Sequence, residues 1–317
     1  MLPEIGMLIV GLIILIVGGD LLVRGASSIA LRSHISPLVV GLTIVAFGTS
    51  APELLISIKA ALGGSPDMTM GNVVGSNICN LGLVLGVTAM IGPIMVRQDS
   101  IKIDWPVTMG SSLLLYYVVK EDVGMIKAYE GGIFIMFLIA YTVFIIRKSR
   151  KETKAKMSNS EGLDIPKASK SLWKDIALIA AGCLGLYFGS EWFVGGAKEM
   201  AGLLGVSERV IGITVLALGT SLPELVTAIV ASLKKQTDLA LGNLMGSNIF
   251  NILSILGITS IIKNIHVSDQ IIHHDMVAML LITLILFPIM VFKRVVGRIA
   301  GVILLSLYLV YTYTVIS

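Results

Sequence analysis

The chain has 317 residues, of which 55% are hydrophobic and only 14% are charged. A soluble domain of this length needs a larger polar surface, so the composition excludes an ordinary soluble protein and predicts a membrane protein. The formal net charge of +4 requires no nucleic-acid partner, because a basic excess in cytoplasmic loops faces anionic lipid.

Ten apolar stretches follow one another along the chain. Most are at least about 17–25 residues long, the length that crosses a hydrocarbon core about 30 Å thick. The strands of a membrane barrel would alternate apolar and polar residues, so these stretches indicate helices. We therefore expect an all-α integral membrane protein with ten transmembrane helices. The expected spans are residues 5–30, 36–62, 69–93, 103–119, 127–147, 173–200, 207–232, 240–262, 271–292 and 295–316.

The basic residues predict the orientation of these spans. If residues 148–172 are cytoplasmic and the loops alternate from there, all but six of the 24 lysines and arginines face the cytoplasm. The positive-inside rule then predicts a multi-pass plasma-membrane protein with both termini extracellular. No cleavable signal peptide is expected, because the first residues include Glu4 and no basic residue. Cys79 and Cys183 lie in expected spans and indicate neither a disulfide nor a zinc site.

A polar, basic segment at residues 148–172 separates two apolar halves. Its composition predicts a flexible cytoplasmic linker, too short to form a regulatory domain. The expected organisation is a first five-helix repeat at residues 1–147, the linker, and a second five-helix repeat at residues 173–317.

The two halves contain an internal repeat with an offset of 171 residues. Residues 36–80 align with residues 207–251 without a gap, and roughly half of the aligned residues are identical. Five spans in each half is an odd number, so the second copy must be inverted relative to the first. Inverted repeats place a substrate site near the bilayer midplane and supply the two related conformations of an alternating-access carrier. A channel needs no such pair of conformations.

The first shared motif is Gly-Thr-Ser-x-Pro-Glu, which ends at Glu53 and at Glu224. A carboxylate at membrane depth is costly and marks an ion or proton path. Pro52 has no backbone N–H to donate within the helix. Backbone carbonyls around Ala46 and Thr49 are therefore expected to lack a helical hydrogen bond and to be able to bind a cation. The alternative is that Ser-x-x-Glu is a capping box that restarts a kinked helix. Because the motif occurs twice, at equivalent depths in the membrane, we favour the interpretation that its oxygens are cation ligands.

The second shared motif is Gly-Asn-x-x-Gly-Ser-Asn-x-x-Asn, which starts at Gly71 and at Gly242. Its first asparagine, its serine and its last asparagine recur every four residues and form a polar stripe on a helix. The glycines have the spacing that allows close helix packing. The deeper polar residues are predicted cation ligands, whereas Asn72 and Asn243 are expected to hydrogen-bond between helices. The predicted ligands here are Ser76, Asn80, Ser247 and Asn251.

Charge counting narrows the substrate. Two ionised glutamates neutralise one divalent cation, whereas an empty site would hold two uncompensated carboxylates. Exchange is therefore favoured over uniport, with two or more Na⁺ or two protons as the counter-ion. The candidate ligands are all oxygen donors, which argues against zinc, copper or iron. No nucleophile–base pair occurs in the spans, so an enzyme is not expected.

The acidic residues Asp20 and Glu191 also occupy equivalent positions, in the first and sixth spans. The sequence leaves two roles open for them, a place in the cation path or a hydrogen bond between helices. Asp67 and Asp238 lie at expected helix starts, where a negative charge is favourable.

The paired motifs that contain Glu53 and Glu224 resemble the α-repeats of sodium/calcium exchangers in the cation/Ca²⁺ antiporter superfamily, over nearly the whole chain. The chain looks like a prokaryotic, archaeal-type member without a large regulatory loop. The resemblance implies ten helices in an inverted 5+5 arrangement, four central cation sites, and sliding of the first and sixth helices. It also implies no cofactor and no obligatory protein partner, with Ca²⁺ and Na⁺ as transported substrates.

The resemblance further implies specific ligands. Glu53 and Glu224 would bind Ca²⁺ with the backbone oxygens of Thr49 and Thr220. Na⁺ would compete there and also use Ala46, Ser50, Ser76, Ala217, Ser221 and Ser247. Asn80 and Asn251 are neutral here, whereas some relatives have aspartate, so the potassium-dependent pattern is not matched and the coupling ratio stays open. We expect an electrogenic Na⁺/Ca²⁺ antiporter, with a H⁺/Ca²⁺ antiporter as the alternative.

Overall fold

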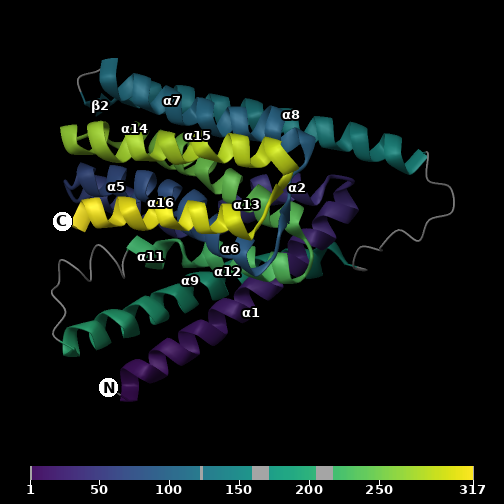
Figure 1. Ribbon diagram of the computed structural model, residues 1–317, viewed down its shortest axis with the longest axis horizontal. Helices are drawn as coiled ribbons and strands as arrows, with labels where there is room; N and C mark the ends of the chain where they lie inside the picture. The colour runs from purple at the N-terminus through teal and green to yellow at the C-terminus, as the bar shows by residue number, and fades with distance from the viewer. Residues whose placement is uncertain (1, 122–123, 159–170, 205–216, 317) are drawn as a thin grey trace.

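The computed structural model describes residues 2–121, 124–158, 171–204 and 217–316. These parts of the chain are almost entirely helical (Figure 1). The first half contains α1 Leu2–Ser33, α2 Pro37–Val40, η1 Gly41–Val45, α3 Ala46–Thr49, α4 Ala51–Leu62, α5 Pro66–Cys79, η2 Asn80–Val84, α6 Leu85–Ile91, η3 Ser100–Asp104, α7 Trp105–Glu121 and α8 Ala128–Ser158. The second half contains α9 Leu172–Leu203, α11 Ala217–Thr220, α12 Leu222–Leu233, α13 Thr237–Phe250, η5 Asn251–Leu256, α14 Gly257–Ile262, η6 Ile271–Asp275, α15 Met276–Lys293 and α16 Arg298–Ile316.

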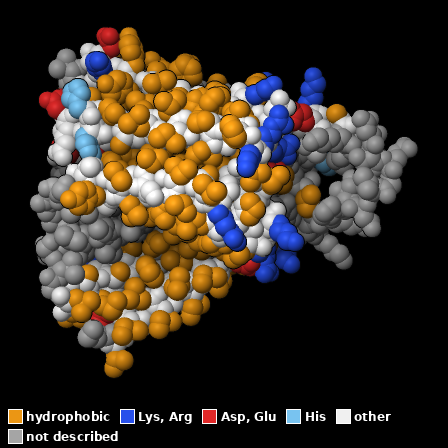
Figure 2. Space-filling model, viewed as in Figure 1, with side chains coloured by type: hydrophobic (Ala, Val, Ile, Leu, Met, Phe, Trp, Pro, Cys, Tyr) orange, Lys and Arg blue, Asp and Glu red, His pale blue; other side chains and the backbone are white. Residues whose placement is uncertain are grey.

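The prediction of an all-helical membrane protein is confirmed. Among the described residues, 7 helices are long and apolar enough to cross a membrane, or up to 8 if one bent pair counts as a single span. The bent pair is Pro37–Thr49 with Ala51–Leu62. Hydrophobic side chains cover the middle of the face seen in Figure 2, and lysines and arginines gather toward one end of it. The start of the span expected at residues 207–232 lies outside the described residues.

Helices α1 and α9 pack against each other along their length and lie obliquely to the rest of the bundle (Figure 1). Glycines allow this close contact. A Cβ atom at Gly18 would lie 2.7 Å from the Leu186 backbone nitrogen, and one at Gly182 would lie 2.6 Å from the Leu22 nitrogen. Any larger residue at these positions would push the two helices apart, since real Cβ contacts are essentially never that short.

The centre of the bundle is formed by α5–η2–α6 and α13–η5–α14, the two most buried spans. In each, an α-helix passes into a π-helical segment that starts at the last asparagine of the second shared motif, Asn80 or Asn251. Such segments interrupt the regular helical hydrogen bonds and are frequent at functional sites. The second motif therefore lies where two interrupted helices meet in the core.

Short strands connect the two halves crosswise at the ends of the bundle. Strand β1 (Ile94–Met95) pairs antiparallel with β4 (Val295–Val296), and β2 (Met125–Ile126) pairs antiparallel with β3 (Ile265–His266). Each pair joins one strand from each half, so the halves form one body rather than two independent domains.

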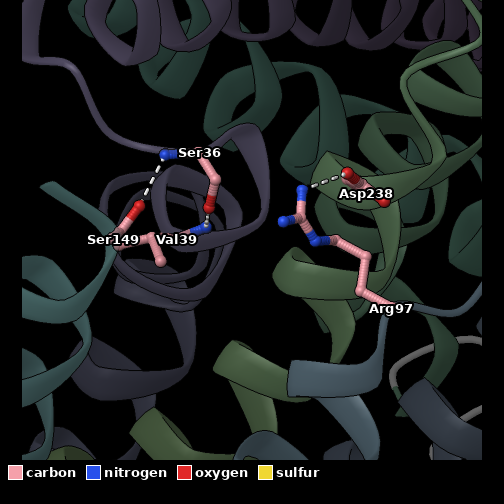
Figure 3. Close-up of polar contacts among 5 residues, drawn as sticks. All are labelled: Ser36, Val39, Arg97, Ser149 and Asp238. Atoms are coloured by element: carbon pink, nitrogen blue, oxygen red, sulfur yellow. Dashed lines mark hydrogen bonds and ion pairs between the residues drawn. The ribbon is translucent and has the colours of Figure 1, made fainter. Parts of the chain in front are cut away.

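We call the end of the molecule that carries the loops 92–99, 234–236 and 294–297 the basic end. Figure 3 shows two of its contacts: the Ser36 N–H donates to Ser149 Oγ (2.8 Å), and Arg97 Nη1 pairs with Asp238 Oδ2 (3.3 Å). Ser149 belongs to α8, which continues past Arg147 to Ser158. Residues 148–158, expected to be part of a flexible linker, are therefore helical, because α8 packs against α2 there. Residues 159–170 lie outside the described residues.

Candidate cation site

The first shared motif breaks its helix in both halves. Helix α3 ends at Thr49 and α4 starts at Ala51, and the two parts meet at an angle of 45°. The break follows from Pro52, which has no N–H to donate to the Gly48 carbonyl. In the second copy α11 ends at Thr220 and α12 starts at Leu222, so the helix is also interrupted there, at Ser221.

The helix does restart at this motif, as the capping-box interpretation expected, but the capping hydrogen bond itself is absent. Ser50 and Ser221 are the residues before α4 and α12, but neither makes a side-chain capping hydrogen bond. The expected release of the Ala46 carbonyl is wrong, because it accepts the Ser50 N–H (3.0 Å) and the Thr49 hydroxyl (3.3 Å). The Ser50 side chain is thus available for another contact across the bundle.

The two glutamates of the first motif are both 0% exposed and lie close enough for their charges to interact. Glu224 Oε1 accepts hydrogen bonds from Ser50 Oγ (3.1 Å) and from Ser247 Oγ (3.3 Å). Ser50 comes from the opposite half of the chain, one turn before Glu53. The two motifs therefore meet at one buried place, although their glutamates are 171 residues apart in sequence.

Further hydroxyl and amide groups surround this pair. Thr49 Oγ1 contacts Asn243 Oδ1 at 3.2 Å and Ser247 Oγ at 3.4 Å. Asn72 donates to the Glu53 carbonyl oxygen (3.1 Å) and to Ser57 Oγ (3.0 Å). The expectation that Asn72 and Asn243 bond between helices is confirmed.

Several oxygens at this place are buried without a hydrogen-bond partner among the described residues. Buried polar atoms are normally paired, so a group of unpaired oxygens indicates room for a ligand that they bind. The unpaired atoms are Glu53 Oε1, Glu53 Oε2, Glu224 Oε2, Asn80 Oδ1, Asn251 Oδ1 and Ser221 Oγ. A cation fits this group, since all of these oxygens can donate electron pairs to it and two residues carry negative charge.

A cavity of about 660 Å³ leads toward the Glu53 side of the site. Its lining includes Pro52 and Ser76 from the first half and Thr220 from the second. Glu191 of α9 and Lys59 of α4 line it as well. Ser76 and Thr220, two of the predicted ligands, thus line this cavity, as does Pro52, the neighbour of Glu53 in the sequence.

Most of the predicted site residues are buried, whereas Thr220 is partly exposed. Glu53, Glu224, Thr49, Ser50, Ser76, Ser247 and Ser221 are all buried, as are Asn80, Asn251 and Ala46. Ala217 is the first residue of α11, and its side chain lies outside the described part of the structure. The site is therefore built from the two helix breaks and from the polar faces of α5 and α13.

Asp20, Asp67 and Asp238 are not brought to this site. Asp20 pairs with Arg24 and with Lys234, Asp67 accepts the Ser268 N–H (3.1 Å), and Asp238 pairs with Arg97. Asp67 and Asp238 lie in the first turns of α5 and α13, as expected.

Two buried residues escaped the sequence analysis, Asn77 and Asn248. Each follows the serine of the second motif and bonds with the last asparagine of the other half. Their repetition at the same motif position in both halves was the signal that could have revealed them.

The site is chemically suited to a hard cation. Its oxygens are carboxylate, amide and hydroxyl groups, which Ca²⁺ and Na⁺ prefer, and the described residues contain no group of three or more His, Cys, Asp or Glu that could hold a metal ion. Two carboxylates surrounded by neutral oxygens suit an ion that binds and leaves.

Comparison with known proteins agrees with this geometry. The model of the family described as sodium/calcium exchanger protein matches residues 4–147 and 174–317. Sodium/calcium exchanger MaX1 of Methanosarcina acetivorans is 33% identical over 96% of this chain and 96% of its own length. Inner membrane protein YrbG of Escherichia coli is 34% identical, over 98% and 96% respectively.

A solved structure of the sodium-calcium exchanger NCX_Mj has the same fold. It superposes with a TM-score of 0.81 at 30% sequence identity and covers 98% of each chain. Matched by the family model over nearly its whole length, this multi-pass membrane chain belongs to the sodium/calcium exchanger protein family.

Proposed function

We propose that the chain is a secondary active antiporter that exchanges Na⁺ for Ca²⁺ by alternating access. The observation that carries this proposal is the convergence of Glu53 and Glu224, both fully buried, among oxygens that have no partner in the described parts of the chain. One Ca²⁺ or two Na⁺ neutralise the two charges. A site left empty is disfavoured, because two like charges then remain in a medium of low dielectric constant.

The proposed ligands are those that the resemblance to the exchanger family implies. Ca²⁺ is bound by Glu53 and Glu224 together with the backbone oxygens of Thr49 and Thr220. Na⁺ shares these groups and also uses Ser50, Ser76, Ala217, Ser221 and Ser247. Ala46 is left out, because its carbonyl oxygen already accepts two hydrogen bonds. Asn80 and Asn251 supply amide oxygens. Supporting this set, the Ser50 and Ser247 hydroxyls already contact Glu224, and Ser76 and Thr220 line the cavity.

The proposed architecture has ten spans in two inverted five-helix repeats, residues 1–147 and 173–317, with residues 148–172 between them. It is supported by helix breaks, π-helical segments and strands that recur at matching positions of the two halves. The termini are proposed to be extracellular and the basic end cytoplasmic, as the positive-inside rule requires. In this orientation the cavity opens to the outside of the cell.

The test is ⁴⁵Ca²⁺ uptake by proteoliposomes loaded with Na⁺, compared with vesicles loaded with acid. Uptake driven by internal Na⁺ supports the proposal. Uptake that does not depend on internal Na⁺ but is driven by a pH gradient would instead establish H⁺/Ca²⁺ exchange. Two buried carboxylates could also support that reaction, because they can carry two protons. Uptake that saturates with Ca²⁺ concentration, depends on the counter-ion and shows no single-channel current would exclude a channel.

We also propose that exchange is electrogenic, as it would be with three Na⁺ moved for one Ca²⁺, the ratio that the resemblance to the exchanger family suggests. One net charge then crosses the membrane in each cycle, worth about 2.3 kcal/mol per 100 mV. Imposing a K⁺ diffusion potential with valinomycin should change the uptake rate in opposite directions for opposite potentials. A rate that is independent of the potential would indicate two Na⁺ per Ca²⁺.

A further inference from the structure

Four asparagines form a buried cluster where the π-helical segments η2 and η5 begin. These segments contact α12 and α4, the helices that carry Glu224 and Glu53. The four asparagines are Asn77 and Asn80 of the first half and Asn248 and Asn251 of the second, and each is at most 1% exposed. We call them the asparagine cluster. Within each half the two residues are one helical turn apart, at the end of α5 or α13 and the start of the following π-helical segment.

The hydrogen bonds of the asparagine cluster run crosswise between the halves. Asn80 Nδ2 donates to Asn248 Oδ1 (3.2 Å), and Asn251 Nδ2 donates to Asn77 Oδ1 (3.0 Å). Asn77 and Asn248 are themselves anchored, since each donates its Nδ2 to the backbone carbonyl of the other, at 3.2 and 3.4 Å. Each half thus holds the amide group of the other half.

These bonds decide which end of an amide faces the site. The oxygen and nitrogen of a carboxamide lie on opposite arms of one plane, so fixing the nitrogen also fixes the oxygen. Asn80 Oδ1 and Asn251 Oδ1 are the arms left buried without a partner among the described residues. Only the oxygen can bind a cation, because a rotated amide would present two N–H donors to it.

We propose that Asn248 and Asn77 are positioning residues for cation binding. Asn248 holds Asn80, and Asn77 holds Asn251, so that an oxygen rather than an amino group faces the ion. The inference rests on the proposed function, in which Asn80 and Asn251 are ligands. It also gives a physical reason for neutral residues at 80 and 251 to serve as ligands: an asparagine needs a fixed orientation, which an aspartate with two equivalent oxygens does not.

That difference supplies the experiment. Asn248→Leu removes the hydrogen-bond acceptor that orients the Asn80 amide. Asn80→Asp makes that orientation unnecessary, because both ends of a carboxylate are oxygens. The two variants and their combination form a double-mutant cycle, read as the Kd for Ca²⁺ of purified protein in Na⁺-free buffer. With Asn80 in place, Asn248→Leu should weaken binding roughly 10-fold to 100-fold, as is usual for groups that orient metal ligands. In the Asn80→Asp background the loss should be far smaller. A difference between the two backgrounds of more than about twofold exceeds the additivity expected of uncoupled sites.

An equal loss in both backgrounds would overturn the proposal, because a defect of packing does not depend on whether residue 80 can rotate. The same cycle with Asn77→Leu and Asn251→Asp repeats the test in the other half, should Asn248→Leu fail to insert. Thr88→Val is the matched control: it removes a buried hydroxyl that bonds to Val84 O within its own helix (2.7 Å), and it should leave the Kd unchanged.

The result is separable from the fate of the proposed function. If the wild-type protein binds Ca²⁺ but does not exchange it for Na⁺, Na⁺/Ca²⁺ antiport is refuted. The double-mutant cycle still tests the positioning role, because it measures only the Kd for Ca²⁺. Wild-type protein that exchanges both ions but shows no coupling between residues 80 and 248 would refute the positioning role alone.

Discussion

Glu53 and Glu224 occupy identical motifs, but their surroundings differ. Glu224 Oε1 accepts two hydroxyl hydrogen bonds, from Ser50 and Ser247, whereas neither oxygen of Glu53 has a partner among the described residues. Ser221, the counterpart of Ser50, likewise has an unpaired hydroxyl. A cation would therefore gain most from contact with Glu53, on the side that the cavity reaches.

Replacing either glutamate should stop transport. Glu53→Gln or Glu224→Gln leaves one charge to balance Ca²⁺, while the side-chain volume hardly changes, so the protein should still fold and insert. We expect Na⁺-driven ⁴⁵Ca²⁺ uptake to fall to the level of protein-free vesicles. Glu121→Gln is the control, since this carboxylate is exposed at the end of α7. Ordinary kinetics in either site variant would remove that glutamate from the site.

At the scale of the helices, the sequence predicted one of the two kinds of departure from a regular α-helix and missed the other. Proline marks the break between α3 and α4, whereas nothing in the sequence marked the π-helical segments at Asn80 and Asn251. The glycines of the second motif, by contrast, mark a close approach of helices, as their spacing predicts. A Cβ at Gly246 would lie 2.7 Å from Leu42 Cα, so this glycine lets α13 pack tightly against η1.

The contact between α1 and α9 should tolerate no added side chain. Gly182→Ala would place a methyl group against the Leu22 backbone, and overpacking of this kind costs about 1–3 kcal/mol. We expect lower thermal stability in detergent and slower exchange. Gly132→Ala on α8 is the matched control, because it is exposed and has no neighbour within 4 Å in the described structure. An unchanged melting temperature for Gly182→Ala would contradict this contact.

The segment between the halves should matter little for ion affinity. Replacing residues 159–170 with a Gly/Ser segment of the same length keeps α8 and its contact from Ser149 to Ser36. We expect the apparent affinity for Ca²⁺ in uptake assays to stay nearly the same, since every site contact described lies in the helices. A large change in affinity would reveal a regulatory site within the replaced residues.

At the scale of the whole molecule, the α1–α9 pair is joined to the rest of the bundle at the basic end. Asp20 of α1 pairs with Lys234, which follows α12, and Ser27 Oγ donates to Gln236 Oε1 (2.6 Å). The open question about Asp20 is thus answered for this conformation: it binds a neighbouring loop. Its counterpart Glu191 lines the cavity of about 660 Å³, whereas Asp20 borders a separate cavity of about 360 Å³ together with Lys234.

The Asp20–Lys234 pair should stabilise the conformation seen here. Both side chains are partly exposed, 28% and 30%, and pairs of this kind contribute about 0.2–1 kcal/mol. We expect Asp20→Asn and Lys234→Gln each to change the exchange rate by at most a few-fold, and the double variant to resemble either single one. Additive effects in this cycle, measured by ⁴⁵Ca²⁺ uptake, would show that the two residues act separately.

The sequence by itself determined the class of the molecule and most of its candidate site. A run of apolar stretches has no other stable arrangement in lipid than helices that satisfy their own backbone, so composition alone predicts the helical membrane fold. Two copies of one motif, each with an acid at membrane depth, mark the candidate ligands because burial of a charge demands a reason.

Only the tertiary structure decided which of these groups meet and how they are oriented. The hydrogen bonds from Ser50 to Glu224 and from Asn80 to Asn248 join residues 174 and 168 positions apart, a separation over which local sequence patterns carry no information. Whether an amide presents its oxygen or its nitrogen depends on the partner across the interface, and that partner is supplied by the packing of α5 against α13 and its π-helical extension. Spacing along the chain identifies the donors, but the packing of helices fixes their geometry.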